Sequence, residues 1–333
     1  MLTRFRPDGF LMLLLAVLAF ATLLPVRGDA AVWFDHLTDA GIVLLFFMHG
    51  AKLSRQAIIG GIGAWKLHLL VLTVTFIVFP LLGLGAVIAL GDDIEPVVAD
   101  GFLFLCIVPS TVQSSIAMTS IARGNVPAAV CSASLSNLLG IVFTPLLATL
   151  LISDGGATDG FFLAALTKVA TTLLLPFLAG HLARPLIGKL VDEHKQLIGR
   201  TDRGVILLVV YGAFSAAVVE GLWSRFSAGD LAMIMVLDSA LLALVLLMTW
   251  QVGRLLSLPK EDEAVLVFCG SKKSLASGVP MAGALFPPAQ VGVVVLPLML
   301  FHQLQLIVCS ALAQIYARRS DATASVKDVR SAI

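Results

Sequence analysis

An apolar stretch at residues 265–286 is interrupted at its centre by residues 270–274, which read Gly-Ser-Lys-Lys-Ser. This interruption constrains the fold more than any other feature, because the flanking residues suit the interior of a bilayer, where a lysine is costly. Main-chain groups that are not hydrogen-bonded within a helix must be satisfied there by protein or water. The pattern therefore predicts a membrane-spanning helix that is broken at the lysines, with the break lining a cavity or a site.

A second stretch, residues 102–122, has the same design: it is apolar, then polar from Pro109 to Ser115, then apolar again. A shift of 163 positions superimposes identical or similar residues of the two stretches, namely Cys106 on Cys269, Thr111 on Ser274, Ser114 on Ser277 and Met118 on Met281. Two broken helices in corresponding places of two halves are typical of the binding site of a secondary transporter. The alternative, two kinked but purely structural helices, leaves the adjacent lysines unexplained.

The composition places the chain among polytopic membrane proteins. Its residues are 59% hydrophobic and 13% charged, against roughly half and a quarter in soluble domains. The lipid bilayer is therefore an expected partner, and a net charge of +1 without a basic patch argues against nucleic acid. The four cysteines fall in apolar segments, so neither a disulfide framework nor a metal cluster is expected. No sequence signal indicates an oligomeric state.

Ten apolar segments approach the length of about 20 residues that crosses a bilayer. They are residues 9–26, 39–53, 65–90, 98–122, 126–152, 161–182, 204–222, 231–255, 263–285 and 290–317. If the N-terminus is cytoplasmic, 17 of the 22 Lys and Arg residues lie on the cytoplasmic side; the exceptions are Arg27, Lys168, Arg225 and the two intramembrane lysines. This bias predicts ten spans with both termini in the cytoplasm. We expect a multi-pass protein of a bacterial inner or plasma membrane.

Ten spans divide into two halves of five, and an odd number per half gives the halves opposite orientations in the membrane. The predicted fold is therefore an all-α polytopic membrane protein, with ten transmembrane helices as two inverted five-helix repeats and with broken, crossing fourth and ninth helices. The first repeat is assigned to residues 1–155, the second to 156–319 and a disordered cytoplasmic tail to 320–333. The longest charged loop is expected at residues 184–203.

Several short strings resemble the bile acid:sodium symporter family. Residues 122–126, Ala-Arg-Gly-Asn-Val, are similar to the turn that follows the broken fourth helix of that family, and the Thr-Pro step at 144–145 is similar to one near the end of its fifth helix. Phe-His-Gln at 301–303 is similar to an aromatic-His-Asn step in the last span. Residues 268–276, Phe-Cys-Gly-Ser-Lys-Lys-Ser-Leu-Ala, look more like the divergent SBF-like branch. The resemblance implies a transporter.

Typical members of the family bind two sodium ions beside the crossing of the broken helices. In register with them, Ser115 takes the place of a serine ligand, but Ile116 takes that of an asparagine. Phe268 and Lys272 stand where a glutamate and a glutamine are expected. The usual sodium sites are therefore largely absent, so sodium is a possible coupling ion and no other cofactor is expected. Nearby oxygen-bearing residues that could bind an ion instead are Thr111, Ser114, Ser115, Ser132 and Asn137.

The paired lysines allow two interpretations. They precede a half-helix that starts near Ser274, and its positive N-terminal end adds to their charge, so an anionic group of a substrate could be held there. Alternatively, one ammonium group replaces a sodium ion as a fixed cation and neutralises the carbonyl ends of the crossing helices. On the first interpretation, the predicted substrate-binding residues are Gln113, Ser271, Lys272, Lys273, Ser274 and His302.

Asp238 is a further ionisable residue within an apolar span. It could be a partner for a lysine, a proton carrier or part of a structural salt bridge. The chain has no Gly-x-x-x-x-Gly-Lys-Ser/Thr, His-Glu-x-x-His or Gly-x-Ser-x-Gly string, which argues against ATP-driven transport and hydrolytic enzymes. We therefore predict a secondary active transporter, not an enzyme, that moves a small organic anion by alternating access and is coupled to sodium or protons. The alternative is an uncoupled channel or ion-homeostasis regulator on the same scaffold.

Overall fold

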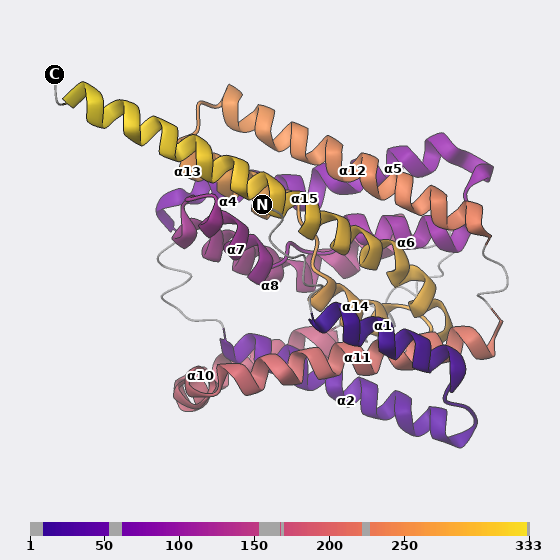
Figure 1. Cartoon of the computed structure of the whole chain (residues 1–333). Coiled ribbons are helices and arrows are strands. Elements are labelled where there is room, and N and C mark those ends of the chain that lie inside the picture. The colour runs from indigo at the N-terminus through magenta and orange to yellow at the C-terminus, as the bar shows by residue number, and fades with distance from the viewer. Residues whose placement is uncertain (1–8, 53–61, 153–166, 168–169, 222–226, 332–333) are drawn as a thin grey trace. The chain divides into compact units, whose positions relative to one another are not determined.

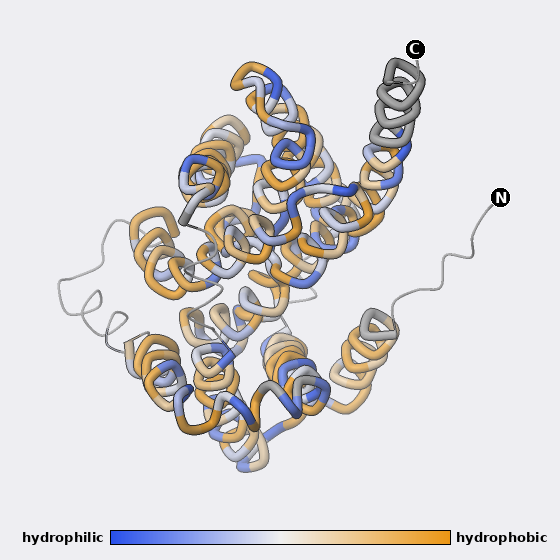
Figure 2. Tube along the Cα trace, turned by 90° about the vertical axis from the view of Figure 1, so that its left-hand side faces the viewer, coloured by the Kyte–Doolittle hydropathy of each residue, from blue (hydrophilic) through white to orange (hydrophobic). Residues whose placement is uncertain are grey.

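The computed structural model describes residues 9–52, 62–152, 167, 170–221 and 227–331, and every regular element in these ranges is a helix. Seven of these helices are long and apolar enough to cross a membrane, and two shorter ones, Met12–Leu23 and Pro96–Ile107, are also apolar. Apolar residues dominate the helices in Figure 2. The predicted class, an all-α polytopic membrane protein, is confirmed; the arrangement of ten spans as inverted repeats stays a prediction.

The chain forms two compact units, and each draws on both predicted halves of the sequence. Unit 1 comprises Met1–Leu53, Ser153–Leu231 and Gly278–Leu296, and unit 2 comprises Ser54–Ile152, Ala232–Ser277 and Pro297–Ile333. The boundary predicted between the two repeats, at residues 155 and 156, lies outside the described residues. The two sequence repeats therefore stay a prediction.

Unit 1 is built around α2. Its described elements are α1 (Gly9–Leu23), α2 (Asp29–Lys52), η4 (Ala170–Leu174), α10 (Leu175–Glu193) and α11 (Lys195–Val219), with the parts of α14 and α15 between Gly278 and Leu296. α2 contacts α10 and α11, and α11 also contacts α1 (Figure 1). A Cβ atom on Gly50 of α2 or on Gly180 of α10 would lie 1.9 Å from a main-chain oxygen of the other helix. Only glycine fits at this close approach.

Two boundaries in unit 1 differ from the sequence predictions. α2 begins at Asp29 rather than at residue 39, and the expected charged loop at 184–203 is helical apart from one residue between α10 and α11. A high charge does not prevent helix formation, because Lys, Arg, Glu and Leu are all good helix formers. One of the charges in this region is also paired, since Asp202 of α11 forms an ion pair with Lys52 of α2.

Unit 2 contains the remaining elements. They are η1 (Ile62–Ala64), α4 (Trp65–Thr73), η2 (Val74–Val78), α5 (Phe79–Leu90), η3 (Gly91–Asp93), α6 (Pro96–Ile107), α7 (Gln113–Ile121), α8 (Val126–Leu151), most of α12 (Ala228–Leu255), α13 (Lys260–Gly270) and parts of α14 (Leu275–Leu285) and α15 (Pro288–Ser331). α13 packs against α4, α7 and α8. η2 is a π-helical turn that interrupts the predicted third span. α15 runs to Ser331, and the disordered tail predicted for residues 320–333 stays a prediction.

Both predicted helix breaks are confirmed. Residues 108–112, between α6 and α7, and residues 271–274, between α13 and α14, are not helical. Pro109 accounts for the first break, because proline disfavours helical backbone in the residue before it, and Val108 has an extended backbone with φ −70° and ψ 153°. α8 makes room for this proline with a glycine: a Cβ atom on Gly140 would lie 2.7 Å from the Pro109 side chain.

The turn between α7 and α8 gives a structural reason for the Ala-Arg-Gly-Asn-Val string. Arg123 has a positive φ of 58°, and a Cβ atom on Gly124 would lie 2.9 Å from the Cβ atom of Ala264 in α13. Asn125 caps α8 by accepting a hydrogen bond from a main-chain N–H of its first turn at 3.1 Å, and it donates another to Asp262 of α13 at 2.9 Å. The string therefore holds α8 against the start of α13.

Candidate functional site

The two helix breaks meet within unit 2, and we call residues 107–115 and 268–277 the crossing. The Ser274 N–H donates a hydrogen bond to the Pro109 carbonyl at 2.9 Å. The hydroxyl groups of Ser110 and Ser115 donate to main-chain carbonyls at the end of α13, at 2.6 and 3.0 Å. The two polar segments that the sequence singled out are therefore joined by direct hydrogen bonds.

Side chains of α8 satisfy further main-chain oxygens of the first break. Thr144 donates to the Ile107 carbonyl at 2.9 Å, and Asn137 Nδ2 donates to the Ser110 carbonyl at 2.6 Å. The Oδ1 atom of Asn137 accepts a hydrogen bond from Ser277 at 2.6 Å. Buried main-chain groups require such partners, so Thr144 and Asn137 fix the shape of the crossing.

Lys273 is fully buried, and main-chain oxygens surround its ammonium group. Its Nζ atom lies 2.9 Å from the Thr75 carbonyl oxygen, 2.7 Å from that of Cys106 and 2.9 Å from that of Val108. It also lies 4.0 Å from the centre of the Phe79 ring, where a cation is attracted to the ring face. An ammonium group has three N–H donors, so Lys273 has none left for a substrate.

Gln305 of α15 holds the main chain of Lys273. Its Oε1 atom accepts a hydrogen bond from the Lys273 N–H at 2.8 Å, and its Nε2 atom donates to the Lys273 carbonyl at 2.8 Å. The side chain is fully buried, and Nε2 also lies 2.8 Å from Nδ1 of His302. His302, a predicted substrate residue, is therefore linked to the crossing through Gln305.

Lys272 is also fully buried, but fewer groups hold it. Among the described residues, the hydrogen-bond acceptor for its ammonium group is the Ser114 carbonyl at 2.9 Å, and the centre of the Phe268 ring lies 6.0 Å away. Two of its three N–H donors therefore remain available. Ser114 belongs to the first turn of α7, where Val112 provides no side-chain cap and Gln113 is exposed. An ammonium group beside an uncapped helix N-terminus is well suited to an anion.

The serines beside the two lysines are bonded at helix ends. Ser271 Oγ donates to the Val267 carbonyl of its own helix at 2.6 Å, a common arrangement for serine in membrane helices. Ser274 Oγ accepts a hydrogen bond from the Ser277 N–H at 3.1 Å and so caps the first turn of α14. These two predicted substrate residues therefore stabilise the ends of the second break.

The predicted ion-binding residues are also bonded within the protein. Ser132 Oγ lies 2.6 Å from Nδ1 of the buried His68, and the Ser114 hydroxyl donates to the Thr111 hydroxyl at 3.3 Å, near the upper limit for a hydrogen bond. Ser115 of α7 and Asn137 of α8 make the hydrogen bonds to the crossing described above. The structure gathers four of the five around the first break, whereas Ser132 contacts α4 through His68.

The predicted site residues did not include Thr75, Phe79 and Gln305, which hold Lys273, or His68, which contacts Ser132. Gln305 left a signal, because an amide within an apolar span requires a buried partner. Thr75 contributes its main-chain oxygen, and no pattern of side chains shows directly which carbonyl lacks a helical partner. The geometry therefore adds a set of ligands around Lys273 that residue types alone did not indicate.

Asp238 of α12 forms no salt bridge with a lysine in the described part of the chain. Both of its carboxylate oxygens are buried there without a hydrogen-bond partner. The described residues therefore do not support the salt-bridge interpretation of this buried carboxyl group.

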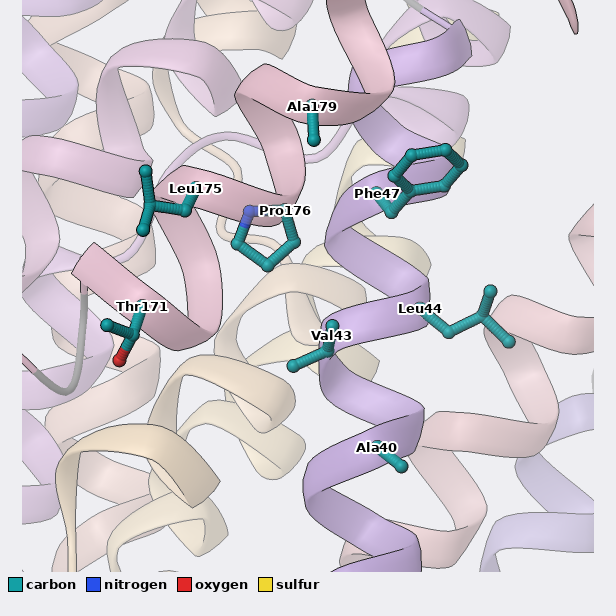
Figure 3. A pocket seen from close by; sticks show the side chains of 8 residues that line it. All are labelled: Ala40, Val43, Leu44, Phe47, Thr171, Leu175, Pro176 and Ala179. Carbon is teal, nitrogen blue, oxygen red and sulfur yellow. The ribbon is translucent and has the colours of Figure 1, made fainter. Parts of the chain in front are cut away.

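A cavity of about 480 Å³ lies in unit 1, beside α2, η4 and α10 (Figure 3). Its lining residues are Ala40, Val43, Leu44, Phe47, Thr171, Leu175, Pro176 and Ala179. Thr171 is the single polar residue among them, and its hydroxyl donates to the Thr167 carbonyl at 2.8 Å. No charged side chain lines this cavity, so its lining offers no cation to an anionic group.

Two broken helices that meet at buried cations in an all-α multi-pass membrane protein are typical of transporters. Within that class, residues 8–318 match the SBF-like CPA transporter family, and the chain belongs to this family. The resemblance noted in the sequence is thereby confirmed. Membership supports a transporter rather than an enzyme.

Three relatives align over nearly their whole length. Uncharacterized protein PA2026 of Pseudomonas aeruginosa is 55% identical, over 97% of this chain and 96% of the relative. "Putative symporter YfeH" of Escherichia coli is 52% identical, over 94% of each chain. Sodium/bile acid cotransporter 7 of Danio rerio is 26% identical, again over 94% of each chain.

Proposed function

We propose that the protein is a secondary active transporter of a small organic anion, coupled to sodium or to protons. Membership of a transporter family supports transport, and the names of two relatives speak of symport and of sodium and bile acid. From those names we take the class of cargo only, an organic anion that moves together with a cation.

The ammonium group of Lys272 is the observation that carries this proposal. A charge in the interior of a bilayer is costly unless it is compensated, and Lys272 has two N–H donors beyond the one that binds Ser114. A carboxylate or similar group that enters beside the exposed Gln113 would accept from these donors. The uncapped first turn of α7 adds main-chain N–H groups that also favour an anion.

In the proposed arrangement, ten spans form two inverted five-helix repeats in a bacterial plasma membrane, with both termini in the cytoplasm. Substrate and coupling ion bind at the crossing, and alternating access exposes the crossing to one side of the membrane and then to the other. The oxygen-bearing residues predicted as ion ligands serve the coupling ion when it is sodium. Their present hydrogen bonds are made within the crossing, so ion binding would exchange some of them.

Uptake into proteoliposomes tests the proposal. The purified protein is reconstituted with an imposed sodium or proton gradient and offered labelled bile acids and small carboxylates. We expect at least one anion to accumulate above its equilibrium level. Lys272→Ala should abolish this accumulation with an unchanged melting temperature, and Lys272→Arg should retain part of it because the charge persists. Lys66→Ala serves as control, since Lys66 is exposed and lies outside the crossing.

Two results would contradict the proposal. Full accumulation by Lys272→Ala would remove Lys272 from the anion site, and equilibration without accumulation would favour a channel.

The dependence on sodium is measured separately, with sodium replaced by choline at fixed pH. Because Ile116 and Phe268 stand where the symporter family has ligands, we expect weaker sodium dependence than in typical members. A complete and cooperative loss of transport in choline would show that sodium binds at residues we have not identified.

A further inference from the structure

We infer that the ammonium group of Lys273 is a tethered cation that occupies a monovalent-cation site formed by three main-chain carbonyls at the crossing. The site consists of the carbonyl oxygens of Thr75, Cys106 and Val108, which lie between 2.7 and 2.9 Å from Nζ. Unwound backbone carbonyls and the C-terminal ends of half-helices are the groups that coordinate sodium in transporters with broken helices. Here the same kind of group surrounds a cation that the chain itself supplies.

The Thr75 carbonyl lacks a helical partner because of the π-helical turn η2. In an α-helix it would accept from the Phe79 N–H, but that N–H donates to the Val74 carbonyl instead. In a continued π-helix it would accept from the next residue, Pro80, which has no N–H. A carbonyl that is buried without a partner costs free energy, and Lys273 provides the donor.

The other two carbonyls lack helical partners because α6 ends. The N–H that would bind the Cys106 carbonyl belongs to Ser110, and it donates to the Ser136 hydroxyl at 3.0 Å. Val108 lies beyond the last residue of α6, in extended backbone. The negative end of the α6 dipole therefore points at Nζ, which favours a cation at this position.

The surroundings of Nζ compensate its charge without an acidic residue. No carboxylate lies within salt-bridge distance of Lys273 in the described part of the chain. The compensation comes from three carbonyl dipoles, from the end of α6 and from the ring of Phe79 at 4.0 Å. Gln305 forms hydrogen bonds with both the N–H and the carbonyl of Lys273. This combination is a cation-binding cage rather than an ion pair.

The consequence for coupling rests on the proposed transport function, whereas the cation site itself does not. If Lys273 already supplies the cation, the crossing needs no sodium ion at this position in order to be stable. The coupling ion would then bind elsewhere or be a proton. Lys273 is in this sense a residue that determines which ion the transporter requires.

The melting temperature of the purified protein tests the cation site without any transport assay. Lys273→Ala removes the atoms from Cγ to Nζ, which correspond to propylammonium, and leaves the three carbonyls in an open cage. We expect this variant to melt below the wild type and to recover much of the loss in sodium chloride or propylammonium chloride, saturably. Choline chloride at the same ionic strength, which is too large for the cage, and neutral 1-propanol should not restore it.

Matched variants separate the cage from general effects. Lys272→Ala should gain no more in sodium chloride than the wild type does, because one carbonyl binds that ammonium group. Lys273→Met fills the space without a charge and should be destabilised without recovery. Equal recovery of Lys273→Ala in sodium and in choline, or in propanol and in propylammonium, would overturn the inference. If the alanine variant does not fold in any of these salts, Lys273→Gln is measured in the same way.

The wild-type protein provides a test that needs no variant. Its gain in melting temperature in sodium chloride over choline chloride should be smaller than that of Lys273→Ala, because the tethered ammonium group already fills the cage. A sodium ion that binds at another site would raise both melting temperatures alike. A sodium-specific increase in the wild type as large as that in Lys273→Ala would overturn the inference. None of these results depends on whether an anion is transported, so failure of the cation site and failure of the proposed function are distinguishable.

Discussion

Replacement of Gln305 by leucine tests whether the polar contacts around Lys273 stabilise the fold. The side chain of Gln305 is fully buried and makes hydrogen bonds of 2.8 Å to both the N–H and the carbonyl of Lys273. Leucine has a similar volume, so the cavity term is small, but both main-chain groups lose their partner. Each buried unsatisfied group costs about 1–3 kcal/mol, so we expect Gln305→Leu to lower the free energy of unfolding by about 2–6 kcal/mol.

Denaturant titration of the protein in detergent, followed by circular dichroism, measures this loss. Gln303→Leu is the matched control, because Gln303 lies in the same helix and is only half-buried. Its substitution should change the free energy of unfolding by less than about 1 kcal/mol. If Gln305→Leu were no more destabilising than Gln303→Leu, the hydrogen bonds to Lys273 would not be a major source of stability, and our account of the crossing would be wrong.

Three further predictions concern packing and buried polar groups. Gly180→Ala should lower the melting temperature, and it should lower the free energy of unfolding by about 1–3 kcal/mol or more, because the added Cβ atom meets a carbonyl of α2. Gly199 has open space around it, so Gly199→Ala should leave both quantities unchanged. Asn125→Ala should cost about 1–2 kcal/mol in denaturant titration through the lost cap of α8. Asp238→Leu should leave the melting temperature unchanged or raise it, because it removes a buried carboxylate that lacks a hydrogen-bond partner in the described residues. A large destabilisation by Asp238→Leu would indicate a partner for this carboxylate.

The helical class and the two breaks could be predicted from the sequence because both depend on residue type. Long apolar runs fix the spans, and Pro109 and the lysine pair mark places where a helix in a bilayer cannot continue without other partners. The prediction of a charged loop at 184–203 was wrong because it, too, was made from residue type alone. Charge shows that a segment leaves the apolar phase, but it does not show that the helix ends there.

The partners of Lys273 could not be predicted, because they are main-chain oxygens. Which carbonyl of a helix lacks a donor depends on a single turn that changes from α to π at residues 74–78, and side-chain periodicity does not report that change. Pro80 is the one clue in the sequence, since it removes an N–H from the middle of an apolar span. Even so, Pro80 shows that the Thr75 carbonyl lacks a donor only once the turn before it is known to be π-helical.

The two adjacent lysines contact α6 and α7, the two helices on either side of the first break. Consecutive side chains of a non-helical segment can point to opposite sides, and these do: Lys273 contacts the end of α6, whereas Lys272 contacts the first turn of α7. A cation is stabilised at the C-terminal end of a helix and destabilised at an N-terminal end. The charge of Lys273 is therefore compensated by the protein, but that of Lys272 is opposed by α7. An anion bound beside Lys272 would gain from both the ammonium group and the helix end, so the asymmetry of the pair favours Lys272 as the anion-binding residue and Lys273 as the fixed cation.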